Sequence, residues 1–158
     1  MIKIGIISDT HILRGMEKIS KSILNEFSNV DKILHAGDFV SIDVLNHLQN
    51  IAPTIGVRGN MDQFNILPAY QELKIEGLKI GLIHNAGSYR EDPVKNPLNL
   101  AKSKGVDVLV YGHTHTRFMK KAGDILLLNP GSPTLADQKS FMTAKINGKD
   151  ISVEVFEL

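Results

Sequence analysis

Five short motifs in this sequence combine oxygen and nitrogen donors, and each directly follows a run of apolar residues. The motifs are SDTH at 8–11, HAGD at 35–38, RGNMD at 58–62, HN at 84–85 and GHTH at 112–115. Their candidate donors are Asp9, His11, Asp38, Asn60, His84, His113 and His115. Imidazole suits zinc, iron, nickel and manganese, whereas carboxylate and carboxamide oxygens suit harder divalent ions. Seven donors are too many for one tetrahedral ion, but they suit two ions if one carboxylate bridges them.

Each motif also has a simpler interpretation. Taken alone, DTH is more often a turn with a capping aspartate, and GD and GN are common turn pairs. His84 alone is more often a hydrogen-bonded histidine at a strand end. The two histidines of GHTH are stronger candidates, because residues two apart on an extended segment share one side. Donors in all five turns favour a shared site over five unrelated turns.

The apolar runs predict the strands that would position these donors. Residues 2–8 are mostly apolar and β-branched, which suits a strand covered on both faces. Residues 32–35, 54–57 and 106–111 predict three further strands, and residues 70–76 and 79–84 flank Gly77 as a hairpin. In open α/β sheets, ligands bind in the crevice at the carboxyl ends of the strands. The five motifs all fall at such ends.

Three helices are predicted between these strands. Apolar residues at helical spacing indicate an amphipathic helix over residues 16–28, and Ser41 is the expected cap of a second helix. Asn96 is the expected cap of a third helix, with Pro97 at its first position and its end near Gly105. The alternation of strands and helices through residue 57 favours parallel strands with helices on the sheet faces.

The second half of the chain is richer in strands. Residues 117–121, 124–128, 141–146 and 151–156 each predict one, and Asn147-Gly148 predicts a tight hairpin turn. The fold class is therefore α/β, with two sheets packed face to face and helices outside. A length of 158 residues fits a single domain, spanning 1–158.

Composition excludes several classes of function. The chain has no cysteine, which rules out disulfides, thiolate metal sites and cysteine nucleophiles. Its formal charge of +1 provides no overall electrostatic attraction to nucleic acid or to a membrane surface. No apolar run reaches the roughly 20 residues that a membrane helix needs. The amino-terminal residues indicate a strand rather than a signal peptide, so we expect a cytoplasmic protein.

The ordered set D-x-H, G-D, G-N, H and G-H-x-H resembles the calcineurin-like metallophosphoesterase superfamily. The small size, GNMD at 59–62 and NPGS at 129–132 look most like its compact bacterial and archaeal phosphodiesterases, the YfcE-like group. The resemblance covers almost the whole chain. It implies a four-layer α/β/β/α sandwich of two mixed sheets, in agreement with the pattern of elements.

The resemblance also assigns the donors to two divalent ions. One ion would be held by Asp9, His11 and His115. The other would be held by Asn60, His84 and His113. Asp38 would be the bridging carboxylate. Manganese is the expected metal, with nickel, iron and zinc as alternatives.

The activity implied is hydrolysis of a small-molecule phosphodiester by in-line attack of a hydroxide that bridges the two ions. Many members of the superfamily have a histidine directly after G-N that assists the leaving group, but this chain has Met61. Asp62 is then the candidate leaving-group acid, with solvent or a metal-bound water as alternatives. Many members also have glycine where this chain has Asn85, which would alter that loop.

Loops near the predicted site supply candidate substrate contacts. Arg58, Arg90 and Arg117 are placed to bind phosphate in bidentate fashion, although each is also typical of a solvated surface. The segment 85–96 is polar and contains Pro93, so we expect it to form a mobile rim that shapes substrate access.

Three other functions were weighed. A protein-binding scaffold of the same fold, as the retromer subunit that resembles this family, would not need all the donors that this chain retains. A nuclease is disfavoured by near-neutral charge and 6% aromatic residues. An amidohydrolase barrel needs about 250 residues. The resemblance also favours a homo-oligomer, but no interface signature supports one.

Overall fold

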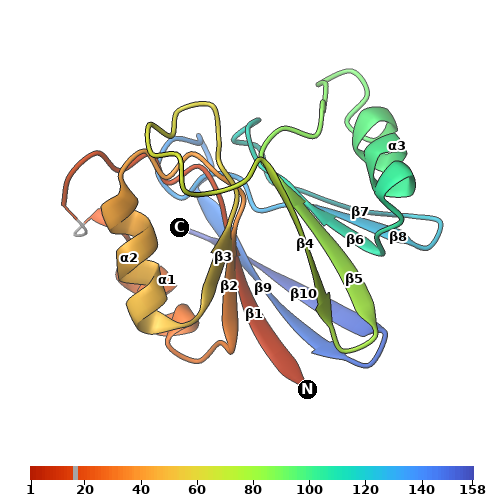
Figure 1. Cartoon of the computed structure of the whole chain (residues 1–158), viewed down its shortest axis with the longest axis horizontal. Helices are drawn as coiled ribbons and strands as arrows, with labels where there is room; N and C mark the ends of the chain where they lie inside the picture. The colour runs from red at the N-terminus through yellow and green to blue at the C-terminus, as the bar shows by residue number, and fades with distance from the viewer. Residues whose placement is uncertain (16–17) are drawn as a thin grey trace.

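The first of two sheets joins strands from the amino-terminal third of the chain to the carboxyl-terminal hairpin. In the computed structural model, which describes residues 1–15 and 18–158, its strand order is β10-β9-β1-β2-β3 (Figure 1). The parallel strands are β1 (Ile2–Ile7), β2 (Lys32–His35) and β3 (Thr54–Gly56). The hairpin strands β9 (Ser140–Asn147) and β10 (Asp150–Glu157) extend it in antiparallel fashion. The expected strands are present, with β1 and β3 each one residue shorter than predicted.

The second sheet faces the first and has the order β4-β5-β6-β8-β7. Its parallel strands are β5 (Leu78–Ile83), β6 (Val108–Val110) and β8 (Ile125–Asn129). Its antiparallel edges are β4 (Tyr70–Ile75) and β7 (Phe118–Ala122). Both sheets therefore mix parallel and antiparallel pairs.

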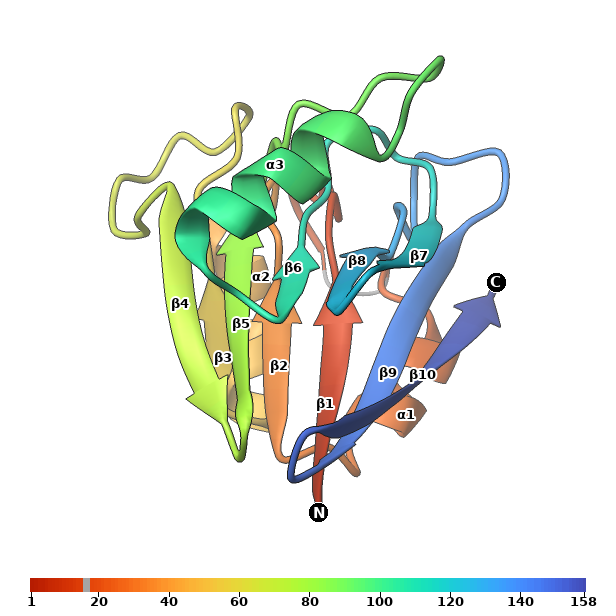
Figure 2. The same ribbon diagram turned by 90° about the vertical axis from the view of Figure 1, so that its right-hand side faces the viewer.

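Helices cover the outer faces of the two sheets. The helices α1 (Lys21–Phe27) and α2 (Ile42–Ile51) pack on the first sheet, and α3 (Lys95–Lys104) packs on the second (Figures 1 and 2). A central apolar cluster, which includes Ile6, Leu34, Leu82 and Val110, fills the space between the sheets. The four-layer α/β/β/α sandwich is confirmed. None of the described helices is long and apolar enough to cross a membrane.

The first helix is shorter than the pattern predicts. It begins after Ser20, whose hydroxyl accepts hydrogen bonds from the N–H groups of Ser22 and Ile23. Of the predicted helix 16–28, Met16 and Glu17 lie outside the described residues. The cap of α2 is as expected, since the Ser41 hydroxyl accepts the N–H of Asp43.

The predicted cap of the third helix is wrong. The Asp92 carboxylate accepts the N–H groups of Val94 and Lys95, so the chain turns into the helix before Asn96. Asn96 lies inside α3 and instead donates its side-chain amide to the Gly87 carbonyl. An acceptor three residues before Lys95 satisfies the first free N–H groups, which leaves Asn96 available for a tertiary contact. The predicted end at Gly105 is confirmed, with φ of 66°.

The strands that precede the five donor motifs all end at one edge of the sandwich. The arrowheads of β1, β2, β5 and β6 point the same way in Figure 2. Because β1, β2 and β3 are mutually parallel, and β5 and β6 are as well, each sheet delivers its polar loops together. The two sets of loops meet above the central cluster.

Candidate dinuclear metal centre

The first donor cluster lies at the carboxyl end of β1. The Oδ1 atom of Asp9 is 3.6 Å from His11 Nε2 and 3.3 Å from His115 Nε2. Asp9 is fully buried. Neither Asp9 Oδ1 nor His11 Nε2 has a hydrogen-bond partner within the described part of the chain. These two buried polar atoms, 3.6 Å apart, are therefore suited to share a metal ion.

The second cluster joins loops from both sheets. Asn60 Oδ1 lies 2.9 Å from His84 Nε2 and 3.2 Å from His113 Nδ1, and these two ring nitrogens are 3.3 Å apart. The other nitrogen of His84 must donate to the Ala36 carbonyl, at 2.7 Å, because a carbonyl only accepts. In a neutral His84, Nε2 would then carry a lone pair that faces the acceptor oxygens Asn60 Oδ1 and Asp38 Oδ2, which is unfavourable. The arrangement requires a proton or a cation between them.

Asp38 lies between the two clusters. Its Oδ2 atom is 3.3 Å from His11 Nε2 and 3.2 Å from His84 Nε2. Its Oδ1 atom accepts the Met61 N–H at 2.8 Å, which fixes the plane of the carboxylate. One oxygen of a single buried carboxylate therefore faces both clusters.

The spacing of the donors fits two divalent ions. Two donors at about 2.1 Å from one ion, roughly 90–109° apart, lie about 3.0–3.4 Å from each other. The separations within the two clusters range from 2.9 to 3.6 Å. The ligand atoms of Asp9, His11 and His115 fall within 4.8 Å of one another, as do those of Asp9, Asp38 and His84.

Charge in the metal-free cluster shifts two pKa values in opposite directions. Burial alone would raise the pKa of Asp38, but hydrogen bonds from His84 and the Met61 N–H outweigh burial and lower it. Burial alone would lower the pKa of His84, but Asp38 and the charge of Asp9 outweigh burial and raise it. In the absence of a metal, both shifts therefore favour an ion pair between His84 and Asp38.

Left-handed backbone turns aim most of the donors. The described non-glycine residues with positive φ number seven, and five of them are donors: Asp9, His11, Asp38, His113 and His115. Each such residue costs about 1–3 kcal/mol and persists only where the surrounding structure enforces it. Residues of this kind cluster at functional sites, and here they coincide with the proposed ligands.

Two glycines in the motifs are required by close approach. A Cβ on Gly59 would overlap Asp38 Oδ1, and a Cβ on Gly112 would overlap the Ser8 hydroxyl and lie 2.5 Å from Asp9 Oδ2. The glycines of the GN and GH pairs therefore let the chain pass directly beside the buried carboxylates.

Asp62 is hydrogen-bonded to the backbone on every side. Its Oδ2 atom accepts the N–H of Gly59 at 2.8 Å and that of Asp38 at 3.0 Å, while Oδ1 accepts the N–H of Val40 at 2.8 Å. Three of the roughly four acceptor positions of this carboxylate are therefore taken by backbone N–H groups. The contacts favour a role in positioning Asp38 over proton donation. Neighbouring Met61 is 51% exposed.

Supporting residues that the sequence reasoning missed lie around Asp9. Its Oδ2 atom accepts the Ser8 hydroxyl at 2.6 Å and the His113 N–H at 3.0 Å. Its carbonyl accepts the Ser132 hydroxyl at 2.8 Å. Asn129 donates to the Gly112 carbonyl at 3.1 Å and so holds the GHTH turn. The sequence signal for Ser132 and Asn129 was the NPGS motif at the end of β8, which lies at the same edge as the donors.

His35 was also missed as a link between two turns. Its ring stacks on Phe39 with centroids 3.5 Å apart and is fully buried. Its Nδ1 atom accepts the Gly37 N–H at 3.1 Å, so Nε2 carries the proton and donates to the Thr10 hydroxyl at 3.1 Å. Burial lowers its pKa well below the ordinary value, so the ring is neutral.

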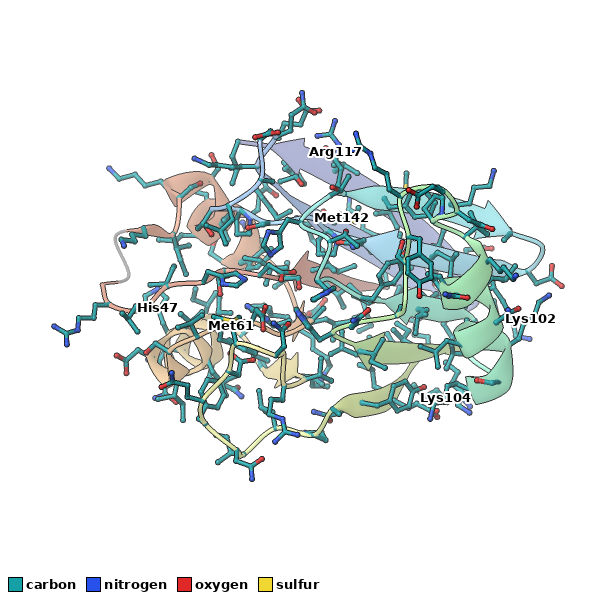
Figure 3. The ribbon with its side chains drawn as sticks, turned by 90° about the horizontal axis from the view of Figure 1, so that it is seen from above. His47, Met61, Lys102, Lys104, Arg117 and Met142 are labelled. Atoms are coloured by element: carbon teal, nitrogen blue, oxygen red, sulfur yellow. The ribbon has the colours of Figure 1, made fainter. Side chains whose placement is uncertain are left out.

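The predicted substrate contacts of the arginines stay predictions, and Arg117 lines the same recess as His115. Arg58 donates to Asn65, and Arg117 pairs with Glu157 at 2.5 Å. Arg90 is exposed on the loop after β5. In the view onto this edge, Met61 and Arg117 lie on opposite sides (Figure 3). The expected mobility of the segment 85–96 stays a prediction, although Asn96 and the Asn85 side chain tie it at Gly87.

Comparison with known sequences identifies related phosphoesterases. The sequence profile of the calcineurin-like phosphoesterase superfamily domain matches residues 2–149. The chain is 46% identical over 149 residues to a probable metallophosphoesterase of Methanocaldococcus jannaschii, which covers 92% of this chain and 77% of that protein.

Solved structures show the same fold. A structure presented as a novel archaeal phosphodiesterase superimposes with a TM-score of 0.75 at 28% identity, covering 98% of this chain and all of that one. Vps29 of Entamoeba histolytica, complexed with zinc, superimposes with a TM-score of 0.81 at 25% identity, covering 99% and 98% of the two chains.

Proposed function

The chain belongs to the calcineurin-like phosphoesterase superfamily, and on that premise we propose that it is a metal-dependent phosphodiesterase with a dinuclear centre. The observation that carries this proposal is the position of Asp38 Oδ2, at 3.3 Å from His11 and 3.2 Å from His84. A buried carboxylate oxygen that faces two separate groups of imidazoles is suited to bridge two ions.

Each proposed ion takes three donors of its own and shares Asp38. Asp9, His11 and His115 would hold the first, and Asn60, His84 and His113 would hold the second. The mixture of imidazole and oxygen donors suits manganese, our first choice, and zinc, which the related Vps29 binds. When bound, such a pair of ions neutralises phosphoryl charge and lowers the pKa of water to about 7.

The protein contributes fixed geometry and fixed tautomers. The bond from His84 Nδ1 to the Ala36 carbonyl leaves Nε2 free to serve as a ligand. The Ser8 hydroxyl and the His113 N–H occupy Asp9 Oδ2, so Oδ1 alone faces the site. Partners of this kind orient ligands and raise their basicity.

The chain offers no free acid for the leaving oxygen in the GNMD loop. Met61 cannot transfer a proton, and the carboxylate of Asp62 is occupied by three N–H groups. Protonation from solvent is then the route that remains. We therefore propose a small-molecule phosphodiester with an acidic leaving group as the preferred substrate.

A protein-binding scaffold is the alternative, because the Vps29 fold superimposes closely on this chain. The two proposals separate in one experiment. Metal content and turnover of bis(p-nitrophenyl) phosphate are measured, with and without chelator, in the wild type, in Asp38→Ala and in Asp124→Ala, an exposed carboxylate in the turn after β7.

The phosphodiesterase requires metal-dependent turnover in the wild type and Asp124→Ala, with a loss of at least about a hundredfold in Asp38→Ala. Wild-type protein that holds two ions per chain but is inactive on every phosphoester would favour the scaffold. A cytoplasmic location, a single domain over 1–158 and a homo-oligomer stay predictions.

A further inference from the structure

A recess opens beside the first donor cluster, between the GHTH turn and the loop that joins β8 to β9. Its volume is about 490 Å³, within the range of pockets that hold small organic ligands. His115, a donor of that cluster, lines the recess, as do Thr116, Arg117, Asp137 and Gln138. The side chain of His115 is 34% exposed, so the cluster and the recess share an accessible wall. We call this the His115 recess.

The cation of the His115 recess is already paired. The side chain of Arg117 is 31% exposed, and its Nη2 atom lies 2.5 Å from Glu157 Oε1 on β10. A carboxylate at this distance cancels most of the attraction that the guanidinium would exert on a further anion. The Nη1 atom is buried and is therefore closed to a ligand. Arg117 thus offers no free charge to a substrate.

A carboxylate of the same recess is unpaired. Asp137 is exposed and forms no ion pair with any residue that the structure describes. Because Arg117 and Glu157 neutralise each other, Asp137 leaves the recess with an excess of negative charge. Gln138 and Thr116 are both exposed and add an amide oxygen and a hydroxyl oxygen as acceptors.

These groups match an ammonium ion better than an anion. An ammonium presents three donors and no acceptor, whereas the recess presents carboxylate, amide and hydroxyl oxygens. An anionic group would face Asp137 without a free cation to compensate, which is unfavourable. Lys139, two residues farther along the chain, is exposed and does not line the recess. The recess therefore distinguishes substrates by the sign of their charge.

The position of the recess indicates which ester arm of a diester it would receive. The leaving oxygen is expected at the GNMD loop, which carries Met61. Met61 and Arg117 lie on opposite sides of this edge of the sandwich (Figure 3). An arm that lies in the His115 recess is then the arm that stays on phosphorus.

We propose that the His115 recess binds the retained arm of a phosphodiester and, through Asp137, selects an arm that carries a primary ammonium group. This inference rests on the proposed function, because it places the phosphoryl group at the donor clusters. It narrows the substrate class from any diester to aminoalkyl diesters. It also implies that an additional anionic group on the retained arm is disfavoured.

The test compares three p-nitrophenyl phosphodiesters that share one leaving group. Their retained arms are 2-aminoethyl, n-propyl and carboxymethyl, which are similar in length but carry a cation, no charge and an anion. With manganese-loaded wild type, kcat/KM should be about threefold to fivefold higher for the aminoethyl than for the propyl ester. It should be lower by a similar factor for the carboxymethyl ester, as expected for one exposed charge at short range.

Two variants with matched controls assign these ratios to the recess. Asp137→Asn should abolish the preference for aminoethyl over propyl, whereas Asp124→Asn, an exposed carboxylate in the turn after β7, should keep it. Glu157→Gln should raise kcat/KM for the carboxymethyl ester about threefold, because it frees Arg117. Glu154→Gln removes the same charge from the same strand beside a different recess and should leave the ratios unchanged.

Equal kcat/KM for the aminoethyl and propyl esters in the wild type would overturn the inference, as would an aminoethyl preference that survives in Asp137→Asn. Hydrolysis of bis(p-nitrophenyl) phosphate in the same samples reports on the proposed function separately. An active enzyme that does not distinguish the three arms loses the recess alone. A protein that is inactive on all four esters loses the proposed function and this inference with it.

Discussion

Asp38 and His84 meet across the two sheets, with Oδ2 3.2 Å from Nε2. Asp38 follows β2 of the first sheet, and His84 follows β5 of the second. The contact that joins the proposed ion sites is thus also a contact between the two halves of the sandwich. Removal of either residue should change both metal binding and the stability of the metal-free protein.

The stabilisation supplied by His84 in metal-free protein should depend on pH. Its pKa is raised in the folded state, so its contribution is fully present below the unfolded value of about 6.5 and is lost as pH rises through the folded value. His35 has a lowered pKa and acts in the opposite direction, so total stability does not isolate the effect. The difference in the free energy of unfolding between the wild type and a His84 variant isolates the effect of His84.

Thermal unfolding in chelator should show that His84→Gln destabilises the protein more at pH 6 than at pH 9. His47→Gln, on α2, is the matched control and should show no such trend. A penalty for His84→Gln that is constant across this range would contradict the ion pair with Asp38.

Gly112→Ala should remove the metal and destabilise the fold by about 1–3 kcal/mol, because the added methyl group overlaps Ser8 and crowds Asp9. Gly105→Ala is the control, since its added atom meets open space and only its positive φ of 66° disfavours a side chain. It should destabilise by about 1 kcal/mol and keep its metal. Metal analysis and denaturant unfolding distinguish the two. Full metal occupancy in Gly112→Ala would contradict the close approach.

Met61→His should improve hydrolysis of esters with poor leaving groups. Met61 is exposed, so the substitution costs little stability, and a histidine there supplies the general acid that the loop lacks. General acids contribute about 10²–10⁴-fold, so we expect gains of at least tenfold for alkyl leaving groups and little change for nitrophenyl. The measurement is the dependence of kcat on leaving-group pKa, with Met61→Gln as control. If the kcat of the wild type already shows no dependence on leaving-group pKa, the wild type lacks no general acid and Met61→His should bring no gain.

Asp62→Asn should weaken metal binding and stability together. An amide offers only one acceptor oxygen, so at least one of the three N–H groups would face a donor, at a cost of about 1–3 kcal/mol. Any activity restored by excess manganese should keep the wild-type dependence on leaving group. If Asp62 is instead the leaving-group acid, the variant will bind metal normally and show a steeper dependence.

The donor set was predictable from sequence because order along the chain maps directly onto space in parallel sheets. Asp9, Asp38 and Asn60 follow strands that lie side by side, so their convergence needed only the strand pattern. The surroundings were not predictable. Asp62 bonds to residues up to 24 positions away, and Arg117 is drawn to Glu157 by a hairpin at the far end of the chain.

The third helix illustrates the same limit at short range. Asn96-Pro97 carries the expected signal for a helix start, yet the helix begins at Lys95 after the N-cap Val94, and Asp92 accepts the N–H groups of both residues. Asp92 and Asn96 both have side chains suited to capping, and only the position of the Gly87 carbonyl, which accepts the Asn96 amide, decides between them. Local sequence preference allows several possible first residues for a helix, and tertiary contacts determine which one is used.

The left-handed donor residues imply a bias in how this protein would change if selection on its chemistry were relaxed. His113 and His115 have φ of 73° and 61°, where glycine or asparagine is more comfortable. Replacing them would sacrifice the ions but release backbone strain. Loss of these two histidines would then favour the stability of the sandwich while abolishing the proposed metal site.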